Sequence, residues 1–354
     1  MTVFDTSFID VRPRIPVDYR PGIAIVGIGG IVKSSHLPAY MKYGIPVASV
    51  YDIRSEATEG IQNEFPIGRI ARSFEEILED PSIEVIDIAT FPEHRIPLVK
   101  QALEADKHVL SQKPLALDMV AAQELVDLAD ARGLKLAVNQ NGRWSPPWRT
   151  ATMLLEAGAI GDMIAVTHIL DRSYRWTIGT HFEKIPHWAI YDYTVHWIDI
   201  TRTWMGNLTP VSVRGRDYRT PNQSPESLTP WGLTVEIDYA NGATALIRAT
   251  GGEPVEPEGH PFFINGTEGK ISGSALGVEC VELHRGNQNQ GFELDGAWFP
   301  DGFAGTMGEL LSAIAEDREP SNSARHNLGS LRLTLAAVAS SDQNGTPIAI
   351  DSDG

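Results

Sequence analysis

The fold of the first part of this chain is decided by the stretch Ile23-Ala24-Ile25-Val26-Gly27-Ile28-Gly29-Gly30-Ile31-Val32. Its first four apolar residues predict a short buried strand that stops at the first glycine. The glycines then allow a tight turn and a close approach of a ligand to the backbone. A helix is expected to follow, whose free amides and positive dipole end would bind a phosphate group. We therefore predict that residues 27–32 cradle the pyrophosphate of a dinucleotide.

The pattern of this first strand repeats along the chain up to about residue 140. Further short apolar strands are expected at 47–51, 85–89, 108–110 and 136–138. The segments between them have apolar residues at intervals of three and four, which predicts amphipathic helices. Such alternation is typical of parallel strands joined by right-handed crossovers. Residues 21–140 are therefore predicted to form an α/β domain of the Rossmann type, with a doubly wound parallel sheet.

The remainder of the chain, residues 141–354, predicts a second domain of the α+β class with a large open, mostly antiparallel sheet. Asn241-Gly242 separates two alternating segments, 233–237 and 243–248, and is a strong hairpin signal. More strands are expected near residues 262, 271 and 281, and helices at 151–157, 308–316 and 328–340. Residues 1–20 are predicted to be an N-terminal arm, either a mobile tail or a segment that packs on a neighbouring subunit.

Composition excludes several classes of function. The 354 residues carry a formal net charge of −17, which disfavours nucleic acid and anionic membranes as partners. No run approaches the ~18 apolar residues that a membrane-spanning helix needs. Cys280 is the only cysteine, so neither a disulfide within the chain nor a cysteine metal cluster is possible. With no secretory signal visible in the first twenty residues, we expect a cytoplasmic protein.

A carboxylate in the expected place identifies the cofactor class. Asp52 ends the second predicted strand, 52 − 27 = 25 positions after Gly27, close to the ~20 residues expected for the group that accepts the ribose hydroxyls. Its charge would repel a 2′-phosphate, which favours NAD over NADP. Arg54 could bind that phosphate, so NADP stays possible. The alternative is that Asp52 only caps a turn before a helix at 55–64. Val32 departs from the fingerprint, whose third position is glycine or alanine.

Three further residues supply the groups that the oxidation of a carbinol needs. His196 has a side chain whose reference pKa of ~6.5 suits a general base at neutral pH. Asp192 would lie on the same face if residues 187–205 form a helix, and could orient the imidazole or bind a substrate hydroxyl. Lys113 could stabilise the developing alkoxide. Each of the three alone would more often be structural, but their occurrence together with the cradle favours catalysis.

Several ordered motifs resemble the oxidoreductases grouped with glucose–fructose oxidoreductase, inositol dehydrogenase and rhizopine catabolism proteins, the Gfo/Idh/MocA family. These motifs are 27–30 with His36-Leu37-Pro38, 88–92 with His94, 107–114, 141–144 and 192–199. The resemblance covers nearly the whole chain after residue 20. It implies an NAD(P)-dependent dehydrogenase with Lys113, Asp192 and His196 as catalytic residues, and a Lys113–Pro114 peptide that is often cis. It also implies cofactor contacts from Thr90, Phe91, Pro92, His94, Gln112 and Lys113, and substrate contacts from Asn141, Arg143, Trp144, His187, Trp188, Asp192 and His196.

The chain departs from the family pattern at two places. Gln112 stands where the family has glutamate, and Pro186-His187-Trp188 replaces a glycine triplet, with Thr194 where a glycine is usual. His187 and Trp188 could contact a polyol or could equally be packing residues. A metal site at His181, His187, His196 and Asp192 is rejected, because their spacing is not that of a ligand set.

The predicted activity is oxidation of a small polyhydroxylated substrate, most plausibly an aldose of pentose size, including a branched one, at C1 to its lactone. A cyclitol dehydrogenase and a keto-sugar reductase are the enzymatic alternatives, and a cofactor-sensing regulator is the non-enzymatic one. The resemblance further implies a homodimer or homotetramer.

Overall fold

The computed structural model describes residues 4–252 and 259–350, which form two compact units. The Rossmann unit consists of residues 12–144 and 296–331. The mixed-sheet unit consists of the described residues within 1–11, 145–295 and 332–354. No helix in the described part of the chain is both long and apolar enough to cross a membrane.

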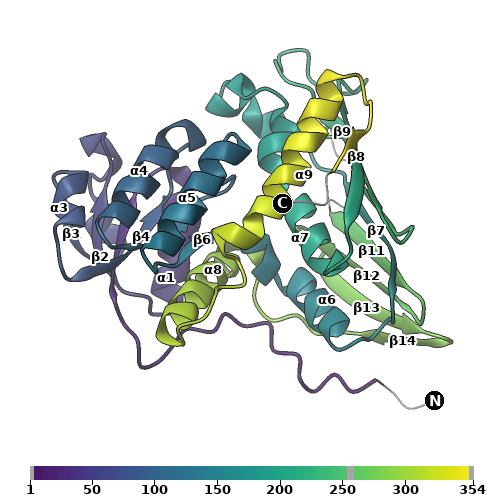
Figure 1. Ribbon diagram of the computed structural model, residues 1–354, viewed down its shortest axis with the longest axis horizontal. Helices are drawn as coiled ribbons and strands as arrows, with labels where there is room; N and C mark the ends of the chain where they lie inside the picture. Colours follow the sequence, from purple (N-terminus) through teal and green to yellow (C-terminus); the bar gives the residue numbers. More distant parts are fainter. Residues whose placement is uncertain (1–3, 253–258, 351–354) are drawn as a thin grey trace. The chain divides into compact units, whose positions relative to one another are not determined.

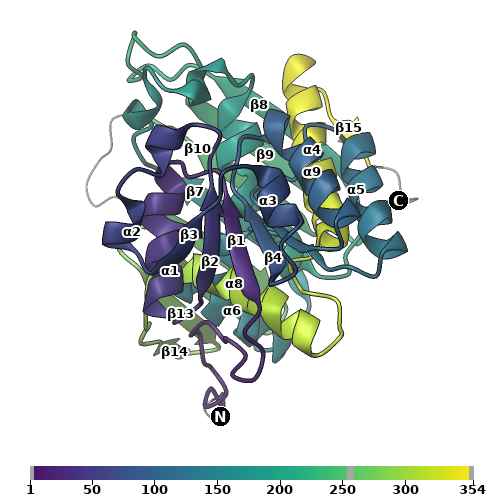
Figure 2. The same cartoon turned by 90° about the vertical axis from the view of Figure 1, so that its left-hand side faces the viewer.

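The Rossmann unit is built on a six-stranded parallel sheet with the order β3-β2-β1-β4-β5-β6. Figure 2 shows β3, β2, β1 and β4 side by side. The strands are β1 (Gly22–Val26), β2 (Val47–Tyr51), β3 (Ile67–Ile70), β4 (Ile83–Ile88), β5 (His108–Ser111) and β6 (Leu136–Val138). β1 and β4 meet where the strand order reverses, and in open α/β sheets ligands bind outside the carboxyl ends of the strands at this point. The predicted Rossmann fold is confirmed.

Helices cover this sheet because their apolar stripes need burial. α4 (Pro92–Glu104) and α5 (Met119–Ala131) contact each other and bury side chains such as Leu103 and Leu125. A separate apolar cluster joins β1 and β2 to α1 (Leu37–Lys42), which follows η1 (Val32–His36), and to α8 (Trp298–Ala315). The remaining short elements are η2 (Ser55–Ala57), α2 (Ile61–Glu64), α3 (Phe74–Leu78) and η3 (Asn141–Trp144).

Two features of the structure add to the predicted division of the chain at residues 20 and 140. Residues 296–331 pack with the Rossmann unit, because Phe303, Met307 and Leu310 of α8 complete its apolar cluster. The described part of the N-terminal arm also contacts its own chain. In the mixed-sheet unit, the hydroxyl of Thr6 accepts a hydrogen bond of 2.9 Å from Gln290, and in the Rossmann unit Tyr19 donates one of 3.1 Å to Glu84.

The mixed-sheet unit is built on nine strands in the order β14-β13-β12-β11-β7-β10-β9-β8-β15. All neighbours pair antiparallel except β7 and β10, so the mostly antiparallel sheet that the sequence predicts is confirmed. The strands are β7 (Met163–Leu170), β8 (Pro210–Tyr218), β9 (Gly232–Tyr239), β10 (Thr244–Ala249), β11 (His260–Gly266), β12 (Lys270–Ala275), β13 (Cys280–Arg285), β14 (Gln288–Gly291) and β15 (Ile348–Ala349).

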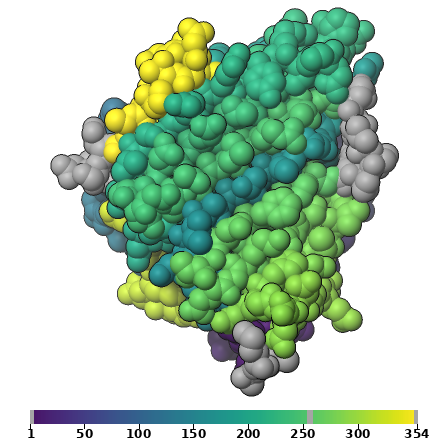
Figure 3. All heavy atoms as spheres, turned by 90° about the vertical axis from the view of Figure 1, so that its right-hand side faces the viewer, coloured from purple at the N-terminus to yellow at the C-terminus, as the bar shows by residue number. Residues whose placement is uncertain are grey.

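In the described part of the chain, two helices of this unit cover one face of the sheet. α6 (Pro146–Glu156) packs on β12 and β13, and α7 (Val195–Met205) packs on β7 and β10 (Figure 1). α9 (Ala324–Asp342) passes from the Rossmann unit into this unit, where Ala337 lies against Gly215 of β8. On the opposite face the side chains of the strands themselves form the surface (Figure 3).

Local expectations are confirmed where a short-range signal is strong. Asn241-Gly242 joins β9 to β10 in a hairpin, with a φ of 87° at Gly242. The helix expected at 55–64 is wrong: η2 and α2 are separate short segments, and a left-handed Gly60 interrupts them. The helices expected at 151–157 and 308–316 begin earlier, at Pro146 and Trp298. Proline at the first helical position explains the earlier start of α6.

Candidate active site

The turn after β1 leaves open space where the sequence predicts a pyrophosphate. Gly27 has a φ of 91°, and a Cβ there would lie 2.9 Å from Cγ2 of Thr90, so only glycine fits. A Cβ at Gly29 or Gly30 would meet no atom within 4 Å. The backbone is therefore held tightly at the start of the turn and is accessible at its tip. Val32, the departure from the fingerprint, is fully buried in the apolar cluster and does not narrow this space.

Asp52 lies directly after β2 and shapes the same turn. Its Oδ2 accepts a hydrogen bond of 2.7 Å from the amide of Ile28, and its Oδ1 accepts one of 2.9 Å from the amide of Arg54. Burial raises the pKa of Asp52, but these hydrogen bonds and the Arg54 guanidinium outweigh it, so the pKa lies below its ordinary value. Asp52 is therefore a carboxylate at neutral pH, beside the open end of the turn.

Replacing Asp52 separates its two roles, the repulsion of a phosphate and the support of the turn. Asp52→Asn keeps an acceptor for the Ile28 amide but removes the charge, so we expect discrimination against NADP to weaken, with a smaller rise in the KM for NAD than in Asp52→Ala. Asp52→Ala removes both, and the KM for NAD should rise on the order of tenfold, as for the loss of a hydrogen bond to a charged group. Steady-state kinetics with both cofactors measures this. An unchanged cofactor preference in both variants would refute the role of Asp52.

The ends of β4 and β5 carry the other predicted cofactor residues, held by a buried guanidinium. Arg95, only 1% exposed, donates to the carbonyl of Thr90 at 3.1 Å from Nε and to the carbonyls of Gln112 and Pro114. It thereby joins the loops that follow two neighbouring strands. The Lys113–Pro114 peptide is cis, as the resemblance implies.

The predicted cofactor residues near Arg95 differ in exposure. Phe91 and His94 are exposed, whereas Pro92 is buried at the first position of α4. Lys113 is partly buried. Gln112 is 8% exposed, and its side chain points into the unit.

The residues predicted to bind substrate after β6 are tied into the Rossmann unit. Asn141 accepts a hydrogen bond of 2.6 Å from the indole of Trp298. Arg143 donates to the carbonyl of Ser321 at 2.7 Å, and Trp144 packs over Gly305 of α8. These contacts give all three residues a role in attaching α8 and the segment after it, whatever else they bind.

Asp192 and His196 lie in two successive helical segments of the mixed-sheet unit. The helix considered for residues 187–205 is divided into two helical segments: η6 (Ala189–Tyr193) is a wide π-helical turn, and α7 begins after Thr194. The cause is Thr194, whose amide and hydroxyl both donate to the carbonyl of Ala189, at 3.0 and 2.6 Å. Such wide turns are frequent at functional sites. Both Asp192 and His196 are partly exposed.

A buried histidine that the sequence did not single out anchors the residue beside Asp192. Nε2 of His260 lies 3.2 Å from the hydroxyl of Tyr193, and its Nδ1 lies 3.2 Å from the carbonyl of Ala275. Burial lowers the pKa of His260 to about 4, so the ring is neutral at pH 7. Nδ1 then donates to the carbonyl and Nε2 accepts the Tyr193 hydroxyl, which fixes η6 next to Asp192.

The neighbouring residues 187 and 188 are packing residues in this structure. Trp188 is fully buried and contacts the rings of Tyr174, Trp176, Phe182 and Tyr193. The Nδ1 of His187 lies 3.1 Å from both carboxylate oxygens of Asp217, and its Nε2 lies 2.9 Å from Asp342. Because carboxylates occupy both ring nitrogens, the packing alternative is favoured over substrate contact for both residues.

The contacts of His187 make folding stability depend on pH. Burial lowers the pKa of His187, but the Asp217 and Asp342 carboxylates outweigh it, so the pKa lies above its ordinary value. A raised pKa in the folded state stabilises the protein fully below the unfolded value of ~6.5, and this contribution is lost as the pH rises through the folded value. We expect His187→Gln to lower the thermal midpoint more at about pH 6 than at pH 9. A difference that is equal at both pH values would contradict this prediction.

The structure thus groups the predicted residues within each unit. The cradle, Asp52, Thr90, Gln112 and Lys113 all lie at the carboxyl edge of the Rossmann sheet. Asp192 and His196 lie in the mixed-sheet unit. Among the described residues, no three histidine, cysteine, aspartate or glutamate side chains are grouped so that they could hold a metal ion.

Two family models match this chain. The model described as "Oxidoreductase family, NAD-binding Rossmann fold" matches residues 22–140, and the one described as "GFO/IDH/MocA C-terminal domain" matches residues 148–272. Together these stretches span more than half of the chain. The chain belongs to the Gfo/Idh/MocA family. As a member, it has the residues predicted to bind the cofactor inside the first match, and Asp192 and His196 inside the second.

Individual relatives of this Gfo/Idh/MocA protein are distant. An uncharacterized oxidoreductase, C26H5.09c of Schizosaccharomyces pombe, is 31% identical over 54% of this chain and 53% of its own. The first curated relatives are thus matched over about half of their length. D-apiose dehydrogenase of Paraburkholderia graminis is 24% identical over 91% of this chain and 88% of its own.

The solved structure of an oxidoreductase from Agrobacterium radiobacter in complex with NAD+, L-tartaric acid and magnesium has a similar fold. Its TM-score is 0.82 at 21% identity, over 93% of this chain and 98% of that one.

Proposed function

We propose that this protein is an NAD-dependent dehydrogenase that oxidises a small sugar, an aldose of pentose size, at C1 to its lactone. The observation that carries the proposal is the open turn at Gly29 and Gly30 beside the ionised Asp52. Only a turn of this kind lets a dinucleotide approach the backbone, and membership of a family of NAD-binding oxidoreductases supports the same cofactor. NADP remains a possible cofactor because Arg54 is exposed next to Asp52.

The residues at the carboxyl edge of the Rossmann sheet fit this cofactor. The accessible backbone of Gly29 and Gly30 would hold the pyrophosphate, and Asp52 would accept the ribose hydroxyls. Thr90 follows β4, one of the two strands at the switch point where such ligands bind, and Gln112 follows the neighbouring β5. When bound, the nicotinamide accepts the hydride that leaves the carbinol carbon.

In this proposal the chain's own residues manage the proton and the developing charge. His196 takes the hydroxyl proton of the sugar as a general base. Asp192 orients the imidazole or binds a neighbouring hydroxyl. The Lys113 ammonium stabilises the alkoxide that forms as the proton leaves. Sugar oxidation at C1 needs these three functions.

The choice of an aldose rests on one relative. The relative that matches nearly the whole chain is named a D-apiose dehydrogenase, and apiose is a branched pentose. At 24% identity this likeness supports a sugar as the substrate class, with the individual sugar as our proposal. Oxidation of a cyclitol hydroxyl, reduction of a keto-sugar and cofactor sensing without turnover are the alternatives. A homodimer or homotetramer stays an expectation from the resemblance.

A substrate panel tests this proposal. The purified protein is incubated with aldoses, cyclitols and sugar alcohols, each with NAD and with NADP, and absorbance is followed at the band of the reduced nicotinamide. We expect reduction on aldoses with NAD, and an acidic product after the lactone hydrolyses. Reduction of the cofactor with cyclitols alone would show that the substrate is a cyclitol and not an aldose. Cofactor binding without reduction on any member of the panel would favour the sensing alternative.

A further inference from the structure

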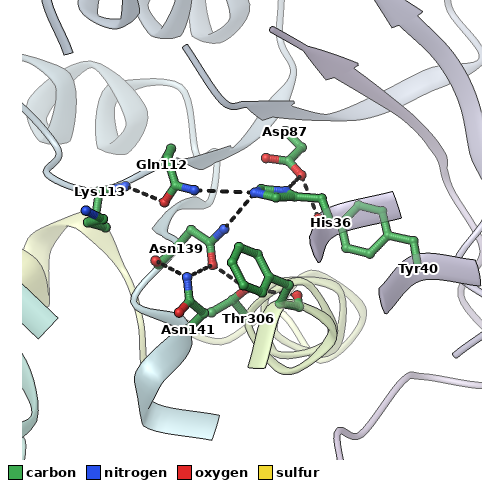
Figure 4. Close-up of polar contacts among 9 residues, drawn as sticks. His36, Tyr40, Asp87, Gln112, Lys113, Asn139, Asn141 and Thr306 are labelled. Carbon is green, nitrogen blue, oxygen red and sulfur yellow. Dashed lines mark hydrogen bonds and ion pairs between the residues drawn. The ribbon is translucent and has the colours of Figure 1, made fainter. Parts of the chain in front are cut away.

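The Rossmann unit contains a buried chain of polar side chains that leads to Lys113 (Figure 4). It begins at Asp87 in β4, which is fully buried. Oδ2 of Asp87 lies 2.7 Å from Nδ1 of His36 and accepts a hydrogen bond of 2.6 Å from the hydroxyl of Tyr40. Its other oxygen, Oδ1, has no hydrogen-bond partner among the described residues. Because burial of a carboxylate costs free energy, Asp87 depends on the hydrogen bonds from His36 and Tyr40.

The hydrogen bonds fix which atoms of these polar side chains donate. Oε1 of Gln112 accepts a hydrogen bond of 2.8 Å from the amide of Lys113. Nε2 of Gln112 must therefore be the atom that faces Nε2 of His36, at 3.3 Å, and it can only donate. Nε2 of His36 then accepts, so the proton of the neutral ring is on Nδ1, where it is donated to Asp87. A second donor, Nδ2 of Asn139, lies 3.4 Å from the same nitrogen and agrees with this tautomer.

Gln112 is thus held at three points. Its side-chain Nε2 donates to His36, and its backbone carbonyl accepts a hydrogen bond from the buried Arg95. Its side-chain Oε1 accepts one from the backbone amide of Lys113. Because Arg95 also binds the carbonyl of Pro114, the backbone is fixed on both sides of Lys113. The lysine itself needs no contact with His36 to be positioned by it.

We propose that His36, held by Asp87 and acting through Gln112, is a positioning residue for Lys113. The inference rests on the proposed function, since it assumes that the position of the Lys113 ammonium limits turnover. It also gives a reason for the glutamine at 112. A glutamine presents a donor to a neutral His36 and an acceptor to the Lys113 amide. It therefore connects the two residues by hydrogen bonds without a second buried negative charge.

Four variants of the full-length protein separate positioning from stability. His36→Asn can still donate to Asp87 but is too short to reach Gln112, and Gln112→Leu removes both functions of the amide. We expect both to lower kcat on the order of 10²-fold, as for a displaced catalytic group. The KM for NAD should stay unchanged in His36→Asn, because His36 is not among the predicted cofactor contacts. Gln112→Glu keeps the acceptor for the Lys113 amide but loses the donor to His36, so we expect a loss of kcat smaller than that in Gln112→Leu. Tyr40→Phe is the matched control, because it removes a bond to the same carboxylate without touching Gln112.

Two readouts do not depend on activity. Nitrogen-15 chemical shifts of labelled histidine should show His36 as the neutral form with its proton on Nδ1. Amide hydrogen exchange at Lys113 should be accelerated on the order of tenfold in Gln112→Leu and unchanged in Gln112→Glu and Tyr40→Phe, because only the leucine lacks an acceptor.

The outcomes separate this proposal from the proposed function. If His36 carries its proton on Nε2, or if Lys113 exchange is the same in Gln112→Leu as in the wild type, the positioning role is overturned. A loss of kcat in Tyr40→Phe as large as that in His36→Asn would overturn it too, because general destabilisation would then explain both. If both readouts agree with the proposal but no sugar is oxidised, the positioning stands and the proposed function fails.

Discussion

Replacing His196 by alanine is expected to lower kcat by about 10²–10⁴-fold while NAD still binds. His196 would be the group that takes the hydroxyl proton, and without it hydride departure would leave a protonated carbonyl. The predicted cofactor contacts lie in the Rossmann unit and should be unaffected, because His196 belongs to α7 of the mixed-sheet unit. Steady-state rates and fluorescence titration with reduced NAD measure the two effects separately.

The matched control for this change is His284→Ala. His284 lies on β13 of the same unit, where its Nε2 is 2.7 Å from the hydroxyl of Ser272. Its loss removes an imidazole and a hydrogen bond, and we expect kcat to stay at the wild-type value. Wild-type turnover in His196→Ala would remove this residue from the mechanism.

Replacing Lys113 by methionine is expected to lower kcat by about 10²–10³-fold, the effect of losing one group that stabilises a developing oxyanion. Methionine keeps the length of the side chain and removes its charge. Because Lys113 is also a predicted cofactor contact, the KM for NAD should rise, unlike in His196→Ala. This difference between the two variants distinguishes a residue at the cofactor from one that acts on the substrate alone.

Lys107→Met provides a control on the same strand. Lys107 precedes β5 and Lys113 follows it, so the two lysines lie at opposite ends. The ammonium of Lys107 is buried and donates to the carbonyls of Asp80 and Ile83 at 2.9 and 2.8 Å. We expect its loss to lower the thermal midpoint and leave kcat unchanged. Equal kinetic effects at both positions would show that Lys113 acts through stability.

The sequence predicted those parts of the site that depend on local signals. Gly27 was identified because a tight turn after a strand requires a positive φ, and Asp52 because the spacing between β1 and β2 is nearly fixed. The hairpin at Asn241-Gly242 was found for the same reason. These features are set by neighbours in the chain, so a single sequence is enough to find them.

The parts that the sequence missed depend on contacts between distant segments. Arg95 reads as an ordinary helical arginine until the structure shows it buried against the loops after β4 and β5. Asp87 is one polar residue in an apolar strand, a mismatch that could have drawn attention to it. The wide turn at η6 was missed because a threonine hydroxyl bonded to a carbonyl five residues earlier leaves no pattern in the sequence.

The packing of helix α8 with the Rossmann unit was not predicted for a similar reason. Its residues 298–315 follow the sheet strands of the mixed-sheet unit in the chain but pack with β1, β2 and α1. Apolar periodicity shows that such a helix needs a partner and does not say which one. The division of the chain into units therefore requires the tertiary structure.

The transfer of a deuterium label tests the central claim most directly. The protein is incubated with NAD and an aldose that it oxidises, deuterated at C1, and the reduced cofactor is isolated and weighed by mass spectrometry. A C1 dehydrogenase must place the deuterium on the nicotinamide, so the reduced cofactor should be heavier than that from the unlabelled sugar. Reduced cofactor without deuterium would show that the hydride comes from another carbon and would contradict oxidation at C1.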